Sequence, residues 1–277
     1  AAFDLLGFDQ DGFWYLPHTY GCVTRLTTAQ HTTTQLTRIA PLAWWEAMYP
    51  QRGGVAWTQA ISDLYEQQHR VGIFDPAKVR GRGAWTDRRR TVVNLGDRLI
   101  VDGVERDITR RLDSRYHYQR GASIGSIAGV EPLSDDEAWQ VLGLCERFHW
   151  EVPGSALLLS GWVALAPVCG ALDWRPHVWL TAAAGSGKTA ILSRFVNPLL
   201  GDLQLACQGS TTEAYIRQRL GQDALPVVMD EAESTGPRDR ARVQSILALA
   251  RQASAESRAV QGRGTAGGMA LTFHVRS

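Results

Sequence analysis

A glycine-rich loop at residues 180–190 constrains this chain more than any other stretch. Residues 182–189 read A-x-x-x-x-G-K-T, which is the pattern of a phosphate-binding loop except that Ala182 replaces the usual first glycine. An apolar run at 177–182 precedes the loop, and an amphipathic run at 190–200 follows it. The sequence therefore predicts a strand, a loop and a helix in that order, which is the context that the pattern requires.

Each residue type in this loop has a physical role in binding a phosphate. Gly185 and Gly187 permit backbone conformations that other residues avoid, so successive N–H groups can turn towards an anion at a helix N-terminus. The Lys188 ammonium would reach the β- and γ-phosphates of ATP, and the Thr189 hydroxyl would bind Mg²⁺. The expected nucleotide contacts are Ala183, Ala184, Gly185, Ser186, Gly187, Lys188, Thr189 and Ala190. The alternative is a glycine-rich strand-to-helix turn without a ligand.

A second candidate feature is the apolar run within residues 225–233, which leads into two adjacent carboxylates. This is the form of a Walker B strand, in which Asp230 would bind Mg²⁺ and Glu231 would orient the attacking water. Lys188 and Glu231 are therefore the candidate catalytic residues. Lysine is rare in this chain, with 2 lysines among 29 basic residues, and one of the two stands in the loop, where a slim ammonium is needed rather than a guanidinium.

The composition is that of an ordinary globular protein with room for two domains, with 277 residues, 44% hydrophobic and 21% charged. A net charge of +1 argues against a protein that coats nucleic acid over its whole surface.

The four cysteines are far apart and lack metal-binding spacing, which favours reduced thiols and the cytoplasm. Residues 152–172 carry no charge and are long enough to span a bilayer, but their glycines, prolines and serines favour a buried helix, so no membrane partner is expected.

Residues 1–126 are predicted to form an α+β accessory domain, whose aromatic side chains are expected to fill a core rather than to stack on bases. Within it, Arg80 and Arg82 lie near Trp85 in a glycine-rich loop. Arginines interleaved with an aromatic residue suit contact with single-stranded nucleic acid. A solvated arginine-rich turn is equally consistent with the sequence.

Residues 127–277 are predicted to form the domain that contains the phosphate-binding loop. Two capping boxes, Ser134 with Glu137 and Ser210 with Glu213, predict the starts of two helices. The second helix would begin near the carboxyl edge of the sheet, where ligands bind in open parallel sheets.

The tail of the chain contains two strand-like pieces, at residues 257–261 and 269–275. The segment between them, G-R-G-T-A-G-G, is rich in glycine and contains Arg263. This pattern predicts a hairpin whose tip exposes Arg263.

Together these features resemble the C-terminal ATPase region of the primase-helicase replication proteins of phages and integrative mobile elements, within the AAA+ class and close in plan to superfamily 3 helicases. The resemblance covers about residues 75–277 and rests on A-A-A-G-S-G-K-T, G-S-T-T-E-A-Y-I-R-Q, V-V-M-D-E-A-E and the arginine-bearing hairpin. It implies an α/β fold of the P-loop NTPase, AAA+-like type, with a parallel sheet and flanking helices that this sequence leaves incomplete at its C-terminal end. A smaller α+β domain would precede it.

The resemblance also implies a DNA helicase or translocase that uses ATP and Mg²⁺ and acts on single-stranded DNA during replication, in the cytoplasm of a bacterial host. Such proteins form homo-oligomeric, hexamer-like rings that bind ATP between subunits and grip one strand with hairpin tips. Carried onto this chain, Arg263 is the best candidate for a DNA contact, and Arg80 and Arg82 are further candidates. The sensor residue and the arginine finger are expected beyond residue 277.

Two other functions remain open from the sequence. An ATP-gated switch would use the same loop to set an assembly state without translocation. A small-molecule kinase would also use it, but the Asp-Glu pair and the glycine-rich hairpin fit a kinase less well. Primase chemistry is not visible in residues 1–126, which show neither a paired-carboxylate cluster nor a zinc ligand set.

Overall fold

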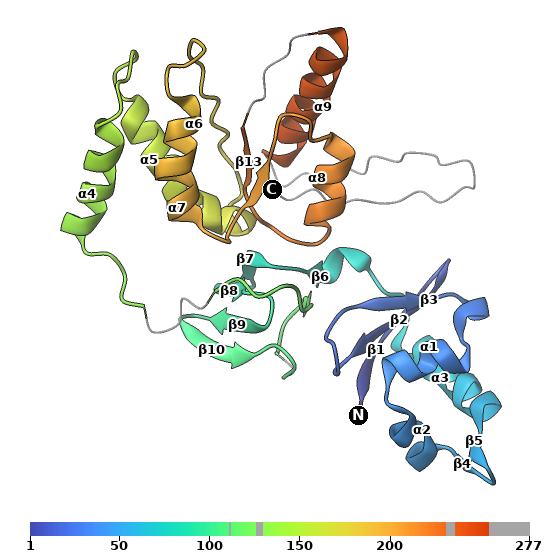
Figure 1. Cartoon of the computed structure of the whole chain (residues 1–277). Coiled ribbons are helices and arrows are strands. Elements are labelled where there is room, and N and C mark those ends of the chain that lie inside the picture. Colours follow the sequence, from blue (N-terminus) through green and yellow to red (C-terminus); the bar gives the residue numbers. More distant parts are fainter. Residues whose placement is uncertain (111, 126–129, 231–235, 255–277) are drawn as a thin grey trace.

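The computed structural model describes residues 1–110, 112–125, 130–230 and 236–254 of the chain. In these ranges it is a mixed α/β structure with several sheets, none of which is closed. Two of the sheets pair parallel strands, and the others are antiparallel. Figure 1 shows the first sheet and its helices at one end, a second sheet in the middle, and the helix-rich C-terminal part at the other end.

The N-terminal part is an antiparallel sheet packed against helices (Figure 1). Its strands, in sheet order, are β1 (Phe3–Asp9), β2 (Gly12–Pro17) and β3 (Thr24–Leu26). The helices are α1 (Thr33–Ile39), α2 (Leu42–Met48) and α3 (Trp57–Val71), with a short ladder of β4 (Pro50–Gln51) and β5 (Gly54–Val55). Tyr15, Leu36 and Trp45 are fully buried in its core. For Tyr15 and Trp45, the prediction that the aromatic side chains fill a core is confirmed.

The middle of the chain forms a second, four-stranded antiparallel sheet. Its strands are β7 (Gly83–Asp87), β8 (Arg90–Asn94), β9 (Arg98–Val101) and β10 (Val104–Asp107), in the order β10-β9-β8-β7. A short parallel pair, β6 (Val79–Arg80) with β11 (His117–Tyr118), lies at its side. Val92 and Leu99 are buried against Trp85, so a small core of its own supports this sheet.

The four-stranded sheet packs directly on the C-terminal part of the chain. Gly83 forms a parallel bridge with Ala224, whose N–H donates to the carbonyl of Arg82 at 2.7 Å. The Arg82 guanidinium donates to the Asp223 carboxylate at 2.6 and 2.9 Å. A Cβ atom on Gly83 would lie 2.2 Å from the Ala224 carbonyl oxygen, so this close approach of two backbones depends on glycine.

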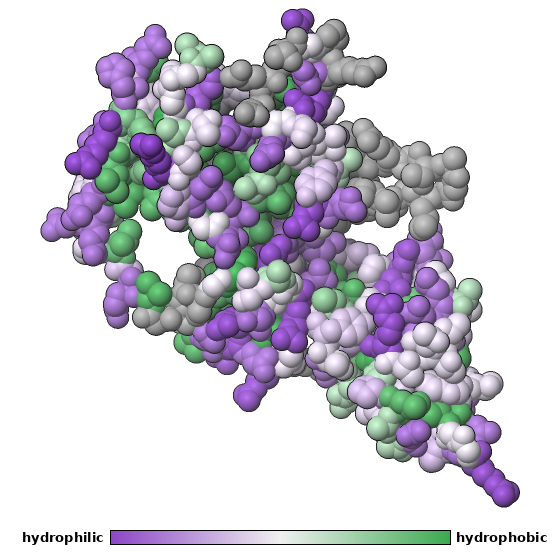
Figure 2. Space-filling model, viewed as in Figure 1, coloured by the Kyte–Doolittle hydropathy of each residue, from purple (hydrophilic) through white to green (hydrophobic). Residues whose placement is uncertain are grey.

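Two helices open the C-terminal part. The first, α4 (Asp135–Glu146), begins at the predicted capping box, in which the Glu137 N–H donates to Ser134 Oγ at 3.3 Å and the Ser134 N–H donates to Glu137 at 2.8 Å. The second, α5 (Ser155–Leu165), continues as the 3₁₀ helix Ala166–Ala171 and buries Leu159 and Val163. Across the described ranges, no helix combines the length and the hydropathy needed to cross a membrane. Figure 2 shows hydrophilic residues interspersed with hydrophobic ones over the visible face of the molecule.

The remaining elements form a small parallel sheet with helices on its faces (Figure 1). A continuous helix is made of α6 (Lys188–Ile191), a π-helical turn at Leu192–Val196, and α7 (Asn197–Leu200). It is followed by β12 (Leu205–Cys207), α8 (Glu213–Leu220), β13 (Val227–Met229) and α9 (Pro237–Ala253). The strands β12 and β13 pair in parallel through their full lengths.

Two local expectations from the sequence are corrected here. The run at 177–182, predicted as a strand, belongs to no sheet in the described part of the chain, because the space between it and β13 is a cavity rather than a ladder. The cap of α8 is Thr212, which accepts from the Tyr215 N–H at 3.2 Å, instead of Ser210. Three consecutive hydroxyl residues offer competing caps, and tertiary packing selects one of them.

The cysteines follow the expectation from their spacing. All four are free thiols, and Cys145, Cys169 and Cys207 are buried. Burial raises the pKa of the Cys169 thiol to about 11, so this group stays protonated and unreactive at neutral pH.

Because Gly83 is bridged closely to Ala224, adding a methyl group at residue 83 should destabilise the fold. Gly83→Ala should lower the free energy of unfolding by about 2–4 kcal/mol, since both backbone strain and a steric clash result. Gly103→Ala is the matched control, because Gly103 also has a positive φ but has open space around its Cβ position. Gly103→Ala should lower the free energy of unfolding by only about 1 kcal/mol, because it adds backbone strain without a clash. Urea unfolding followed by tryptophan fluorescence measures both, and equal losses would contradict the close packing.

Candidate functional site

The glycine-rich loop has the bent backbone that its sequence predicts. Gly185 and Gly187 have φ angles of 76° and 97°, in the left-handed region that favours glycine. Ser186 closes the turn, since its N–H and its hydroxyl both donate to the Ala183 carbonyl, at 3.2 and 2.6 Å. Gly187 is the N-cap of α6, so Lys188 and Thr189 are the first two residues of the helix. The loop therefore presents its backbone at a helix N-terminus, where an anion is favoured.

The loop and the end of β13 meet through Thr189 and Asp230. The Thr189 hydroxyl donates to Asp230 Oδ1 at 3.3 Å, and both side chains are accessible to solvent. The Asp230 N–H donates to the Cys207 carbonyl at 3.1 Å, which fixes the carboxyl end of β13 beside that of β12. Two sequence motifs that are 41 positions apart thus come together at one point.

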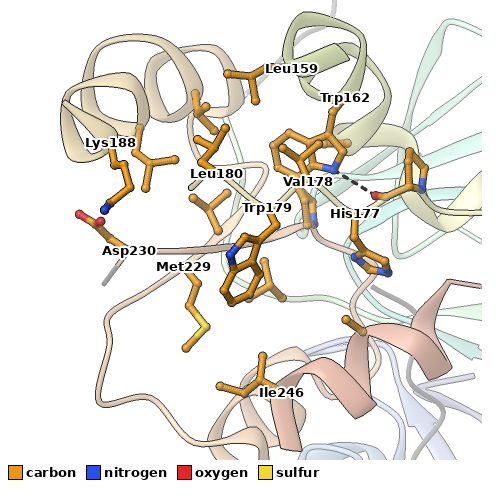
Figure 3. Close-up of a pocket in the computed structure, with 18 of the residues that line it drawn as sticks. Leu159, Trp162, His177, Val178, Trp179, Leu180, Lys188, Met229, Asp230 and Ile246 are labelled. Carbon is orange, nitrogen blue, oxygen red and sulfur yellow. Dashed lines mark hydrogen bonds between the residues drawn. The ribbon is translucent and has the colours of Figure 1, made fainter. Parts of the chain in front are cut away.

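The Lys188 ammonium lies at the same point. It donates to the Ala182 carbonyl at 2.6 Å, across the mouth of the loop. Figure 3 shows Lys188 and Asp230 pointing towards one another at one end of a cavity. A phosphate bound in the loop would compete with the Ala182 carbonyl for this ammonium.

The cavity beside these residues has a volume of about 850 Å³, which lies within the range of small-molecule sites. One end is polar and is lined by Ala182, Ala184, Gly185, Lys188, Thr189 and Asp230. The rest is mainly apolar, and Figure 3 shows Leu159, Trp162, Trp179, Met229 and Ile246 around it. The polar end is therefore the part of the cavity that has the chemistry to bind a phosphate.

The structure brings together part of the predicted site. Lys188, Thr189 and Asp230 line one cavity with the loop backbone at Gly185. The other predicted nucleotide contacts, Ala183, Ser186, Gly187 and Ala190, belong to the same loop and helix start but do not line the cavity. Glu231 and Arg263 lie outside the described residues.

Thr189 and Asp230 have the donor chemistry that Mg²⁺ prefers. A hydroxyl and a carboxylate are hard oxygen ligands, and Mg²⁺ at nucleotide sites takes one or two such protein ligands together with phosphate oxygens and waters. Within the described ranges, no group of three or more His, Cys, Asp and Glu side chains is placed to bind a metal ion. The observed pair suits a metal that is shared with a bound triphosphate, and it lacks the ligands of a closed protein site.

Arg80 is not exposed as the sequence-based hypothesis requires, whereas Arg82 is partly exposed. Arg80 is 3% exposed, and its guanidinium lies over the rings of Trp85 and Tyr116, with centroid distances of 4.8 and 3.8 Å. Arg82 pairs with Asp223 between two parts of the fold. The Arg80 guanidinium is buried in internal packing, which fits neither an exposed nucleic-acid contact nor a solvated turn. The Arg82 side chain is 22% exposed, and its contact with nucleic acid stays a prediction.

Two residues that line the cavity, Arg175 and His177, were not identified from the sequence. Arg175 is 3% exposed and donates to the Cys169 carbonyl at 2.7 Å and to the Ala253 carbonyl at 3.1 Å. His177 lines the cavity, and partial desolvation there lowers the pKa of its imidazole. No signal marks Arg175 in a chain this rich in arginine, because its role depends on contacts with residues far away in sequence.

Comparison of the chain with models of known protein families, with curated proteins and with solved structures found no match.

Proposed function

We propose that the chain binds ATP together with Mg²⁺ at the polar end of the cavity and hydrolyses it. The observation that carries this proposal is the hydrogen bond between Thr189 and Asp230, 3.3 Å long. A loop that only turned the chain from one element into a helix would have no reason to place its hydroxyl on an acidic strand end. A nucleotide site needs this juxtaposition, because one metal ion must reach both motifs.

The roles of the residues follow from their positions. The backbone N–H groups of the loop and the N-terminus of α6 bind the phosphates, while Lys188 neutralises part of their charge. Thr189 and Asp230 would bind Mg²⁺, which neutralises charge that develops on the transferred phosphoryl group. Glu231, the next residue along the chain, is proposed to orient the attacking water and to accept its proton. These parts position the reactants rather than form covalent intermediates.

A P-loop NTPase domain of the AAA+-like kind is the fold that best fits this site. Its support is the order of elements, in which the loop is followed by a helix, a strand, a helix and the acid-bearing strand. The parallel pairing of β12 with β13 agrees with that order, because parallel strands joined by a helix are the repeating unit of such sheets.

We further propose that hydrolysis drives translocation on single-stranded DNA. The support is the resemblance in sequence to the ATPase region of phage and mobile-element primase-helicases, together with the glycine-rich hairpin that contains Arg263. From the same resemblance we propose that identical subunits form a ring and that the protein lies in the cytoplasm. An ATP-gated switch remains the second candidate, since it would use the same loop and the same carboxylate.

The two lysines of the chain give a matched test of nucleotide binding. Lys188→Ala should weaken binding of a fluorescent ATP analogue by about 10- to 100-fold, because a charge-assisted contact with phosphate is lost. Lys78→Ala, which removes an exposed lysine that does not line the cavity, should leave the affinity unchanged. Equal effects of the two substitutions would show that the loop does not bind the triphosphate.

Glu231→Gln tests hydrolysis and separates the motor from the switch. The variant should bind ATP as tightly as the wild type, while turnover falls by at least about 100-fold because the water loses its base. In the wild-type chain, single-stranded DNA should raise the rate of phosphate release, measured with a coupled assay. A rate of phosphate release that stays constant on adding DNA would contradict the proposed motor. A Glu231→Gln variant that keeps its partner-bound state would favour the ATP-gated switch.

A further inference from the structure

The segment that leads into β13 is held by the four-stranded sheet of the middle part of the chain. The Gly81 N–H donates to the Gln222 carbonyl at 2.8 Å, and the Ala224 N–H donates to the Arg82 carbonyl at 2.7 Å. Gly83 lies beside Ala224 in a parallel bridge. These backbone contacts attach the start of β7 to the chain just before β13, and Figure 1 shows β7 at the edge of its sheet that faces the C-terminal part.

The Arg82 side chain adds charged hydrogen bonds to this attachment. Its backbone N–H donates to Asp223 Oδ1 at 2.7 Å, and its guanidinium Nε and Nη2 donate to Asp223 Oδ2 at 2.9 and 2.6 Å. The Arg82 side chain is 22% exposed and the Asp223 side chain 13%, so solvent screens the pair only in part. Hydrogen bonds between charged groups are stronger than neutral ones, and the planar guanidinium also fixes their direction. One residue of the sheet therefore holds both oxygens of the Asp223 carboxylate.

The space around this segment is tight where two other elements meet it. A Cβ atom on Gly81 would lie 2.3 Å from Asp223 Oδ1, and a Cβ atom on Gly170 would lie 2.5 Å from the Ala224 Cβ atom. Gly170 belongs to the 3₁₀ helix that follows α5, so this helix also lies against the segment. In such close packing, residues 222–224 can shift only if one of these elements moves with them.

Asp230 lies one short strand beyond this segment. The strand β13 has 3 residues and spans about 10 Å. In the described part of the chain, β12 is the one strand that pairs with it. At its carboxyl end, the Asp230 N–H donates to the Cys207 carbonyl at 3.1 Å, and the Thr189 hydroxyl donates to Asp230 Oδ1 at 3.3 Å. Because an extended backbone cannot stretch, the position of its amino end also limits where this carboxylate lies.

We propose that Arg82 is a positioning residue for Asp230. By holding Asp223, Arg82 sets the position of β13 along its axis and so places the Asp230 carboxylate beside Thr189 for the metal ion. This inference rests on the Mg²⁺–ATP site proposed above. It assigns the four-stranded sheet, which precedes the predicted domain boundary between residues 126 and 127, to the same working unit as the phosphate-binding loop.

The affinity for ATP, titrated in the full chain with excess Mg²⁺ and again with the metal chelated, tests this role. Arg82→Ala should weaken binding in Mg²⁺ by about 10-fold, because a misplaced carboxylate no longer orients the metal ion. Binding without Mg²⁺ should stay unchanged, since Lys188 and the loop backbone do not depend on Arg82. Asp223→Ala should have the same effect, and the double variant should be no weaker than Asp223→Ala alone, because both residues act through one contact.

Arg90→Ala is the matched control. Arg90 pairs with Asp87 in the same sheet, with a side chain that is 27% exposed, but at the opposite end of β7 from Gly83. The substitution removes an ion pair of similar burial that does not touch the segment before β13. It should therefore leave the affinity for ATP in Mg²⁺ unchanged.

Amide hydrogen exchange without nucleotide gives a second readout, which does not depend on the proposed function. The Asp230 amide, bonded to the Cys207 carbonyl, should exchange at least about 10-fold faster in Arg82→Ala than in the wild type, relative to the amide of Val92. Val92 is buried in the four-stranded sheet and reports whether the variant is folded. Arg90→Ala should leave the ratio of the two exchange rates unchanged.

Three results would overturn the proposal. The first is an equal loss of affinity with and without Mg²⁺ in Arg82→Ala, and the second is an unchanged affinity in Mg²⁺, whether or not binding of single-stranded DNA falls. The third is unchanged exchange at Asp230. A wild-type chain that shows no Mg²⁺-dependent binding of ATP would instead contradict the proposed function, and exchange at Asp230 would still decide whether Arg82 fixes the strand.

Discussion

The hydrogen bond from the Thr189 hydroxyl to the Asp230 carboxylate connects two parts of the chain that are 41 positions apart in the sequence. Their contact is possible only because the loop turns sharply at Gly185 and Gly187, and because β13 is aligned with β12 so that its carboxyl end faces the loop. Each of these conditions is local, but together they define a site. The polar end of the cavity and its proposed chemistry depend on that convergence.

The support for this site extends beyond its own strands. Ala224, just before β13, is bridged to Gly83, and Asp223 is held by the Arg82 guanidinium. The four-stranded sheet is thus attached to the segment that leads into the acid-bearing strand. The middle of the chain is therefore in direct contact with the segment that leads into the strand of Asp230.

The conformation of the loop could be predicted from sequence, whereas the tertiary environment of individual residues could not. Gly185, Gly187 and Lys188 are informative because a phosphate needs those residue types at that spacing, and the conformation of the loop agrees. Arg80 was misjudged because its sequence neighbours look like an exposed basic loop, while Tyr116 covers it from a distant position. The apolar pattern of residues 177–182 predicted a strand. A strand also needs a neighbouring strand to pair with, and the local sequence does not show whether one is present.

The most direct test of the central claim is a double-mutant cycle on Thr189 and Asp230, with the affinity for ATP measured by titration in excess Mg²⁺ and again with the metal chelated. If one metal ion bridges the two side chains and the triphosphate, Thr189→Ala and Asp230→Ala should show a coupling of at least about 1 kcal/mol with Mg²⁺, and the coupling should disappear without it. Additive effects of the two substitutions in the presence of Mg²⁺ would contradict the account.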